Sequence, residues 1–407
     1  MYFWQMRRIG VIGGGAAGFF AAIQAASLGN SVTIFEKTSK LLSKVKVSGG
    51  GRCNVTNSCP EISKLVKFYP RGEKFLRRVF QQFSVPDTIA WFESRGVQLK
   101  VEPDGRIFPI SDSSQSVIDA LKREASKVGV VVKTKTEVKS IVRSGHGFQL
   151  GFDGYSEQVD CVIVTSGGHP KSSGYDFIRP LGHRIIDPIP SLFTFNTPKD
   201  PLRSLPGISM PNAHIRLEGT KLEYMGPLLI THWGVSGPAV LKLSAFGAQW
   251  LHDHMYRARA QIRWDATFTE EGLRIALHGY RESYPKRKIS AHPLFQIPAR
   301  LWLFLNEQAG IDSGLVWHQI SKKQINRLLE NLFRFTIEID GKTTFKEEFV
   351  TAGGVRLDEI SPDTMESRLV NGVFFAGEVI DVDGITGGFN FQAAWSTGFV
   401  AGISVNQ

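Results

Sequence analysis

Residues 8–22 read RIGVIGGGAAGFFAA, and residues 31–37 read SVTIFEK. These letters predict an apolar strand, a glycine-rich turn, a helix of small residues and a second apolar strand, in that order. The turn has the spacing Gly-x-Gly-x-x-Gly between a strand and a helix, the setting in which this pattern indicates dinucleotide binding. We therefore predict a Rossmann-type βαβ unit near the start of the chain.

Each glycine of the turn has a separate physical task. Gly13 permits the tight turn, Gly15 lets a pyrophosphate approach the backbone, and Gly18 lets the helix pack closely on the sheet. The free N–H groups at the helix start, Ala16 and Ala17, would face the phosphates together with the positive end of the helix dipole. A glycine-rich turn without a ligand is the alternative interpretation.

An acidic residue ends the second strand at the distance that a ribose contact requires. Glu36 lies 18 residues after Gly18, where a carboxylate can accept hydrogen bonds from both ribose hydroxyls of a dinucleotide. Lys37 follows it directly, and we assign both residues to the cofactor site.

Length and composition indicate a globular protein of two or more domains. The chain has 407 residues, and no apolar run reaches the roughly 18 residues of a membrane span. The first residues, MYFWQMRR, are too short and wrongly ordered for a signal peptide. Three cysteines are few and odd in number, which favours the reducing cytoplasm. No Cys/His spacing indicates a metal site.

The formal net charge of +10 bears on the partner. Two stretches, 40–78 and 252–300, hold much of the excess, and apolar residues interrupt the basic ones in both. A solvated basic surface is the simpler interpretation. A site for an anionic substrate or a nucleic acid is the alternative that the charge leaves open.

Three later segments favour FAD over NAD as the dinucleotide. Residues 46–57 read KVSGGGRCNVTN, a turn that would place N–H groups and a guanidinium near phosphates or the flavin edge. Residues 159–168, VDCVIVTSGG, are a buried strand that ends in small residues. Residues 372–402 are an apolar strand, a glycine loop and a small-residue helix, which completes a two-part FAD fold. An NAD dehydrogenase would not need this second glycine-rich site.

These segments supply the remaining candidate cofactor residues. They are Gly50, Gly51, Arg52, Asn54, Ser166, Gly167, Gly168, Gly377, Glu378, Asp381, Gly387, Gly388, Phe389 and Asn390. The start of the last helix, around Gly387 and Gly388, would stabilise charge on the reduced flavin. For Arg52 and Asn54 the alternative is a role in bracing the loop, and for Glu378 and Asp381 it is that of structural loop carboxylates.

Two further segments carry reactive side chains. Cys53 and Cys59 resemble a redox dithiol only superficially, because five residues separate them; a small, buried Cys53 is the better interpretation. In residues 231–238, THWGVSGP, His232 is the catalytic candidate for proton exchange, with a structural histidine as the alternative. Ser236 is expected to cap the helix that follows.

The combination of SGGGRCNVTN (48–57), THWGVSGPAVLKLS (231–244), TAGGV (351–355) and GEVIDVDGITGGFNFQAAWSTG (377–398) resembles one family over nearly the whole chain. It is that of the HI0933-like flavoproteins, bacterial NAD(P)/FAD-dependent oxidoreductases that include aminoacetone oxidase-like and BaiN-like members. The resemblance implies a Rossmann-like α/β FAD-binding domain interrupted by an insert domain, a small β-barrel with a helical subdomain. It does not imply a particular reaction.

Domain boundaries follow from this layout. We expect FAD-binding parts at 1–190 and 346–407 and an insert at 191–345. Within the insert, barrel strands would occupy about 191–265 and 333–345, and helices about 266–332. The proline-rich segment DPIPSLFTFNTP (187–198) marks the first crossing.

The preferred functional hypothesis is a cytoplasmic FAD-dependent oxidoreductase that acts on a small molecule in a cleft between the FAD and insert domains. Because no second strand-GxGxxG-helix unit is present, NAD(P)H would bind only transiently as the electron donor. The alternatives are a flavin-dependent RNA-modifying enzyme and a non-enzymatic flavin-binding redox module.

Overall fold

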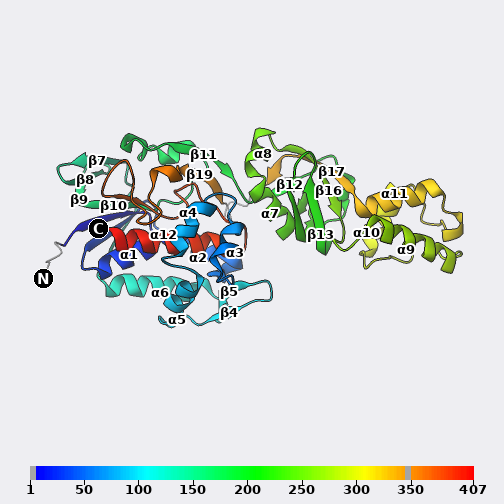
Figure 1. Ribbon diagram of the computed structural model, residues 1–407, viewed down its shortest axis with the longest axis horizontal. Helices are drawn as coiled ribbons and strands as arrows, with labels where there is room; N and C mark the ends of the chain where they lie inside the picture. The colour runs from blue at the N-terminus through cyan, green and yellow to red at the C-terminus, as the bar shows by residue number, and fades with distance from the viewer. Residues whose placement is uncertain (1–5, 344–349) are drawn as a thin grey trace. The chain divides into compact units, whose positions relative to one another are not determined.

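The computed structural model describes residues 6–343 and 350–407, which fall into two units, each described here by itself. Unit 1 comprises Met1–Ser191 and Phe345–Gln407, and unit 2 comprises Leu192–Thr344. Unit 2 therefore interrupts unit 1 in the sequence (Figure 1). The boundary expected at 345/346 lies outside the described residues. No described helix is long and apolar enough to cross a membrane.

Unit 1 is built on a five-stranded parallel sheet with the order β20-β10-β1-β2-β6. The strands are β1 (Arg8–Ile12), β2 (Ser31–Glu36), β6 (Val131–Thr134), β10 (Cys161–Val164) and β20 (Val373–Phe375). The inner strands β1 and β10 are apolar and almost wholly buried, as expected for a sheet covered on both faces. The C-terminal strand β20 pairs with β10, so both ends of the chain contribute to one sheet.

Two long helices pack on this sheet, α1 (Ala16–Ser27) and α12 (Phe389–Ser404), and Figure 1 shows them side by side. Glycines permit their close approach. A Cβ added at Gly398 would lie 2.7 Å from the Ala17 carbonyl oxygen, and one at Gly402 would lie 2.5 Å from that of Ala21. Since Ala17 faces Gly398 and Ala21 faces Gly402, the two helices run in the same direction.

The other elements of unit 1 include one more long helix, α6 (Ser114–Lys127), and several shorter ones. Its remaining α-helices are α2 (Ser43–Val47), α3 (Ile62–Leu65), α4 (Glu73–Phe80), α5 (Val85–Glu93) and α6 (Ser114–Lys127). Three small antiparallel sheets contain β3 (Thr56–Asn57), β4 (Leu99–Val101) and β5 (Arg106–Pro109); β7 (Ser140–Ser144), β8 (Gly147–Gly151) and β9 (Ser156–Val159); and β11 (Ile185–Pro190) with β19 (Thr351–Val355). The consecutive strands β6 and β7 belong to different sheets, and Lys135 lies in a left-handed conformation between them.

Unit 2 contains a seven-stranded antiparallel sheet of order β17-β16-β13-β14-β15-β12-β18. Its strands are β12 (Thr194–Asn196), β13 (Ser209–Leu217), β14 (Glu223–Ile230), β15 (Gly234–Ser236), β16 (Arg257–Arg263), β17 (Phe335–Asp340) and β18 (Lys342–Thr343). The two end strands, β17 and β18, follow one another in the chain, so the sheet curls back on itself as a small barrel does. Helices α7 (Pro238–Phe246) and α8 (Ala248–Asp253) accompany it.

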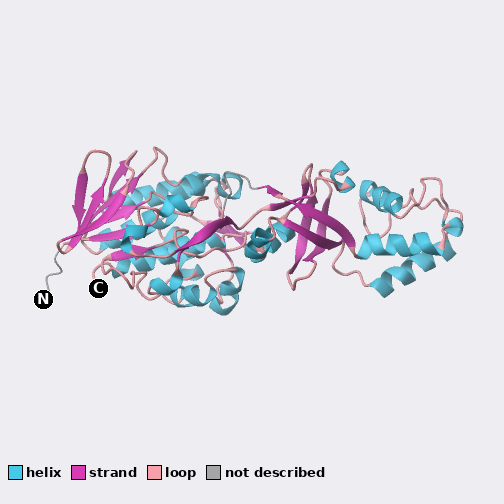
Figure 2. Ribbon diagram, turned by 90° about the horizontal axis from the view of Figure 1, so that it is seen from above, coloured by secondary structure: helices cyan, strands magenta, loops and turns pink. Residues whose placement is uncertain are grey.

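Between β16 and β17 the chain forms three helices, α9 (Glu270–Ser283), α10 (Ala299–Gln308) and α11 (Lys322–Phe333), which Figure 2 shows beyond the strands of the same unit. Local sequence sets the starts of two of them: Thr269 caps α9, and Ser321 forms a capping box with Gln324 at α11. Trp302 and Trp317 are fully buried in the core that joins helices and sheet. We call α9–α11 the helical subdomain.

Candidate functional site

The three glycines of the turn differ in the space beside them. Protein atoms fill the space next to Gly13 and Gly18, but not the space next to Gly15. A Cβ at Gly13 would lie 2.4 Å from the Thr165 carbonyl oxygen, and one at Gly18 would lie 2.0 Å from that of Gly13. At Gly15 no described protein atom lies within 4 Å of the added Cβ, and its φ of −91° is ordinary. Gly15 therefore borders free space at the start of α1, where a phosphate would meet the helix N–H groups.

The helix start is suited to an anion in charge as well as in shape. The first turn of α1, which begins with Ala16 and Ala17, contains no acidic residue, and no side chain caps it. The Oε2 atom of Glu36 accepts a hydrogen bond from the Gly14 N–H at 2.9 Å, and Oε1 accepts one from the Thr38 N–H at 2.8 Å. The carboxylate at the end of β2 is therefore held beside the glycine turn. Lys37 is exposed.

The loop after α2 is joined to the start of α12, although more than 330 residues separate them in sequence. The Asn57 Nδ2 group donates to the Gly387 carbonyl oxygen at 3.0 Å. With the Asn54 amide oriented to satisfy its neighbours, its oxygen accepts from the Gly388 N–H at 2.9 Å and its nitrogen donates to the Thr56 carbonyl oxygen at 2.8 Å. Two glycine-rich motifs thus form one structural element.

Loss of the Asn54 side chain should weaken this junction. Asn54 is buried, and Asn54→Ala would leave the Gly388 N–H and the Thr56 carbonyl without their partner. We expect the free energy of unfolding to fall by about 1–3 kcal/mol, measured by urea denaturation. Asn57→Ala, which removes only the hydrogen bond to the Gly387 carbonyl oxygen, is the matched control and should cost less. Equal stability of Asn54→Ala and the unchanged protein would contradict the bracing role.

In the SGGG turn, Ser48–Gly51, protein atoms leave free space next to the last two glycines, and the arginine that follows has partners within the protein. Gly50 and Gly51 have positive φ, and a Cβ on either would meet no described atom within 4 Å. The Arg52 guanidinium instead pairs with Glu102 at 2.6 Å and lies 4.0 Å from the Phe108 ring centre. These contacts favour the alternative given above for Arg52, that it braces the loop.

At the start of α12, two of the candidate side chains have structural partners. Phe389 is buried and stacks on Phe68 with ring centres 4.5 Å apart. Asn390 uses both amide groups on Gly384, accepting from its N–H and donating to its carbonyl oxygen, each at 2.8 Å. The backbone around Gly387 and Gly388, rather than these side chains, is what this helix start offers to a ligand.

The carboxyl ends of β10 and β20 meet beside the same region. Ser166, Gly167 and Gly168 follow β10, and a Cβ on Gly168 would lie 3.0 Å from the Glu378 carboxyl carbon. Glu378 pairs with Lys44 and accepts from the Thr351 N–H at 3.0 Å.

The residues around Glu378 are also held by backbone contacts. Gly377 donates its N–H to Thr397 Oγ1 at 2.9 Å. Asp381 accepts from the Gly353 N–H at 3.0 Å, and burial raises the pKa of its carboxyl group. Glu378 and Asp381 both fasten the returning chain to β19.

A buried ion pair next to these residues has no signal in the sequence. Asp383 is fully buried and pairs with Arg71, whose position is 312 residues earlier. Ser191 donates a hydrogen bond to the same carboxylate and accepts one from Arg71 at 3.1 Å. Burial raises the pKa of Asp383, and the Arg71 charge opposes that rise. No local pattern links these three residues, because only the fold brings them together.

The cysteines and the loop of unit 2 are more easily assigned. All three cysteines are free; Cys53 is fully buried, and burial raises its pKa to about 12.

The loop at residues 231–238 of unit 2 contains the catalytic candidate. His232 is exposed, and its ring has no hydrogen bond or ion pair with any described residue. Ser236 ends β15 instead of capping α7: the residue before the helix is Gly237, whose φ of +95° favours glycine, so that expectation is wrong. Among residues 6–343 and 350–407, no group of three or more His, Cys, Asp or Glu side chains is placed to hold a metal ion.

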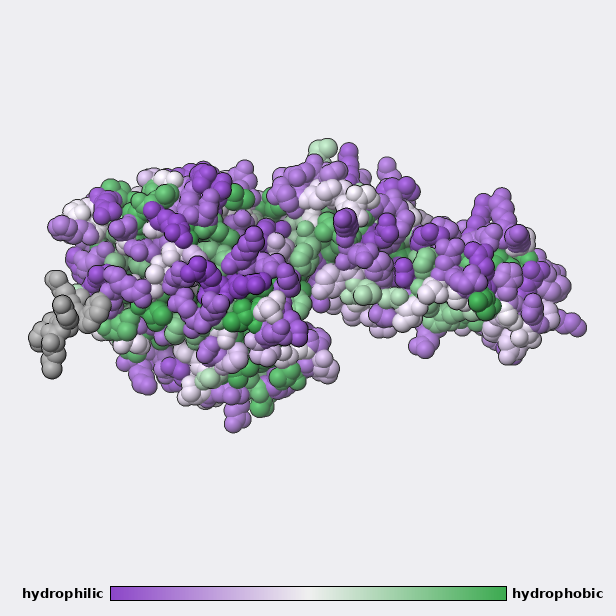
Figure 3. All heavy atoms as spheres, in the orientation of Figure 1, coloured by the Kyte–Doolittle hydropathy of each residue, from purple (hydrophilic) through white to green (hydrophobic). Residues whose placement is uncertain are grey.

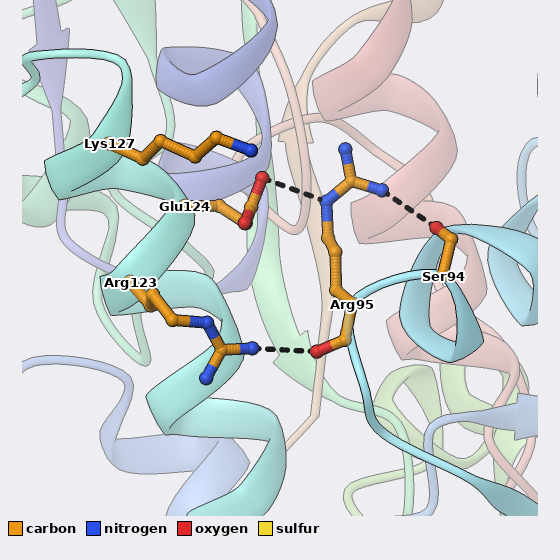
Figure 4. Close-up of a pocket in the computed structure, with 5 residues that line it drawn as sticks. All are labelled: Ser94, Arg95, Arg123, Glu124 and Lys127. Atoms are coloured by element: carbon orange, nitrogen blue, oxygen red, sulfur yellow. Dashed lines mark hydrogen bonds and ion pairs between the residues drawn. The ribbon is translucent and has the colours of Figure 1, made fainter.

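A small surface pocket lies between the end of α5 and helix α6 (Figure 4). Ser94, Arg95, Arg123, Glu124 and Lys127 line it. Its polar side chains already have partners within the protein. Arg95 forms an ion pair with Glu124 at 3.2 Å, and Arg123 donates a hydrogen bond to the Arg95 carbonyl oxygen at 2.6 Å. This pocket shares no residue with the glycine turn, and we assign it no role in the chemistry.

A parallel sheet with its glycine turn, its carboxylate and an interrupting unit defines the Rossmann-like FAD-binding fold, as predicted. The model of the HI0933-like protein Rossmann domain matches residues 7–404, so the chain belongs to the HI0933-like family. This confirms the resemblance found in the sequence.

Known proteins similar to this chain differ in the substrates that their names give. A 3-dehydro-bile acid delta(4,6)-reductase from Clostridium scindens is 30% identical over 98% of both chains. A ribosomal RNA dihydrouridine synthase from Haemophilus influenzae is also 30% identical over 98% of both chains. In fold, the chain resembles a 3-ketosteroid-delta4-(5alpha)-dehydrogenase from Rhodococcus jostii RHA1, with a TM-score of 0.51 and 14% identity over 100% of this chain and 98% of that one.

Proposed function

We propose that this protein binds FAD and uses it to reduce a carbon–carbon double bond conjugated to a carbonyl group. The observation that carries the cofactor assignment is the pair of parallel helices that start beside glycine-rich backbone. Gly398 of α12 faces Ala17 of α1, so at 1.5 Å per residue α12 begins about 12 Å beyond the start of α1. Two helix N-termini thus point the same way, one suited to a pyrophosphate and one to a flavin ring further along.

The residues at the start of each of these two helices fit the part of FAD that we assign to it. Gly15 leaves space for the pyrophosphate, and Glu36 lies where the adenosine ribose would bind. The positive end of the α12 dipole would stabilise negative charge on the reduced ring. The bound cofactor supplies hydride chemistry, and the protein supplies binding, orientation and charge.

The class of reaction is supported by what the names of the relatives share. A 3-dehydro-bile acid with a double bond at position 4 is a conjugated ketone, and the relative is named as its reductase. Dihydrouridine differs from uridine by saturation of the ring double bond that is conjugated to a carbonyl. Both names describe the addition of two hydrogens to an electron-poor double bond. We therefore assign this chemistry to the present chain.

Of the two substrate classes, we favour a uridine in ribosomal RNA. The chain carries a net charge of +10 and a pI near 9.4, which favours a polyanion over a small molecule. A small conjugated ketone, in line with the preference from the sequence, is the second candidate. NADPH or NADH is the proposed electron donor.

One experiment distinguishes these possibilities. The purified flavoprotein is reduced anaerobically with NADPH or NADH, then given either unmodified ribosomal RNA made by in vitro transcription or a panel of steroid enones. We expect flavin reoxidation on adding RNA and dihydrouridine in its nucleoside digest by mass spectrometry. Reoxidation by an enone alone would move the assignment to the small molecule. A protein that cannot be loaded with FAD would overturn the proposal as a whole.

We also propose His232 as the group that gives a proton to the substrate. Its exposed ring has no partner among the described residues, so it is free to exchange a proton. His232→Gln should lower kcat by about a hundredfold or more while FAD content stays unchanged. His146→Gln, a change of another exposed histidine in the β7–β8 hairpin, is the control. A His232→Gln enzyme with full kcat would exclude this role.

A further inference from the structure

The helical subdomain carries a group of exposed basic residues near the end of α9 and the start of α11. We call it the α9–α11 basic patch, and its cations are Lys286, Arg287, Lys288, Lys322, Lys323 and Arg327. All six are exposed, and none forms an ion pair with a residue in the described part of the chain. Their charges are therefore not neutralised by described partners. In Figure 3, hydrophilic side chains cover much of the visible surface of these helices.

Backbone contacts bring the two halves of the patch together. The Trp317 N–H donates to the Arg287 carbonyl oxygen at 3.1 Å, and Lys288 forms a β-bridge with Val316. His318 donates its N–H to the Pro285 carbonyl oxygen at 2.8 Å, and Lys322 follows four residues later. An extended chain of that length spans at most about 14 Å. The cations of both segments thus lie within reach of a few successive phosphates.

Aromatic side chains accompany the charges. The Arg287 guanidinium lies 4.1 Å from the centre of the Tyr284 ring, and it donates to the Tyr280 hydroxyl at 3.4 Å. Tyr284 is 39% exposed. A tyrosine stacked with an arginine plane is the kind of surface on which an unpaired base stacks.

Acidic residues next to the patch are few. Glu282 and Glu330 are exposed near its two segments, and neither pairs with one of its six cations among the described residues. Charge and aromatic surface together fit a nucleic acid with unpaired bases better than a purely anionic surface. We propose that the α9–α11 basic patch binds the backbone of RNA and stacks an unpaired base on Tyr284. This inference rests on the proposed RNA substrate and adds the surface that holds it.

The test compares two triple variants of equal charge change in the FAD-loaded, full-length protein. Lys286→Ala, Arg287→Ala and Lys288→Ala are combined in the patch variant. The matched control combines Lys199→Ala, Arg216→Ala and Lys221→Ala, three exposed cations in the sheet part of unit 2. Fluorescence anisotropy with unmodified ribosomal RNA transcripts measures affinity over a series of salt concentrations, and thermal melting verifies that each variant is folded.

We expect the patch variant to lose tenfold or more in RNA affinity at about 50 mM salt. Three lost phosphate contacts should also reduce the slope of log affinity against log salt by about 2 for single-stranded RNA. The control should change both quantities much less. Tyr284→Ala should weaken binding about fivefold or more with little change in slope, because stacking is not a charge contact.

The possible failures can be told apart. If the folded patch variant binds RNA as the unchanged protein does, the patch assignment is wrong, even when the enzyme makes dihydrouridine. If the unchanged protein binds no RNA, or binds only vesicles of anionic lipid, both the patch assignment and the RNA substrate are wrong. Reduction of the flavin by NADPH or NADH should be the same in all these variants, which separates either failure from loss of the cofactor.

Discussion

Gly15→Ala should leave the protein folded but weaken FAD binding by about ten- to a hundredfold. The structure gives the reason: a Cβ at this position meets no described atom within 4 Å, and the backbone conformation suits any residue. The methyl group would occupy only the space assigned to the pyrophosphate. Each tenfold loss corresponds to about 1.4 kcal/mol of binding free energy. Titration of the apoprotein with FAD, followed by flavin fluorescence, measures the change.

The other two glycines of the turn are the controls. Added Cβ atoms at Gly13 and Gly18 would lie 2.4 Å and 2.0 Å from backbone oxygens of the protein itself. Gly13→Ala and Gly18→Ala should therefore lower the stability of the apoprotein, which Gly15→Ala should not do. FAD affinity in Gly15→Ala equal to that of the unchanged protein would disprove the location of the pyrophosphate.

The second large effect is expected for Arg71→Ala, which should destabilise unit 1 by about 3–5 kcal/mol. Arg71 pairs with the fully buried carboxylate of Asp383, and its removal leaves a buried charge without its cation. Urea unfolding at neutral pH measures the loss. Adding Asp383→Asn to Arg71→Ala removes that charge, so the double variant should be more stable than Arg71→Ala alone. The reverse order would show that the pair does not act in this way.

The pH dependence of Arg71→Ala has a definite sign. Burial already raises the folded-state pKa of Asp383 above its ordinary value of 3.8, and loss of the opposing Arg71 charge should raise it further. A raised folded-state pKa means that the folded protein binds the proton more tightly than the unfolded chain. The penalty is thus complete above the folded-state pKa and shrinks as the pH falls through it toward 3.8. Stability of the variant relative to the unchanged protein should increase on acidification.

Sequence patterns predict most of unit 1 because its motifs are local. The Gly13–Gly18 turn, the acid at Glu36 and the small residues of α12 each depend on neighbours a few positions away. A local capping box of Ser84 with Asp87 likewise starts α5 shortly after α4 ends.

Side-chain roles are harder to predict because a residue type does not determine its partner. Arg52 stands in a glycine-rich loop suited to phosphates, yet Glu102 and Phe108 engage it. Asn390 lies in the first turn of α12, whose start we assign to the flavin, yet its amide forms hydrogen bonds with the backbone of Gly384. In each case a partner that no sequence pattern identifies competes for the same polar group.

By itself, the sequence determined the FAD-type Rossmann fold, the family and the glycine-rich segments. The reason is that backbone conformation and helix starts depend on short stretches of neighbouring residues. Only the tertiary structure decided which of those segments meet. It joined residues 48–57 to the start of α12, offset two parallel helix starts by about 12 Å, and buried Asp383 against Arg71. The physical reason is that these hydrogen bonds, burial and charge pairing join residues more than 300 positions apart. No sequence pattern predicts which residues meet over such a separation.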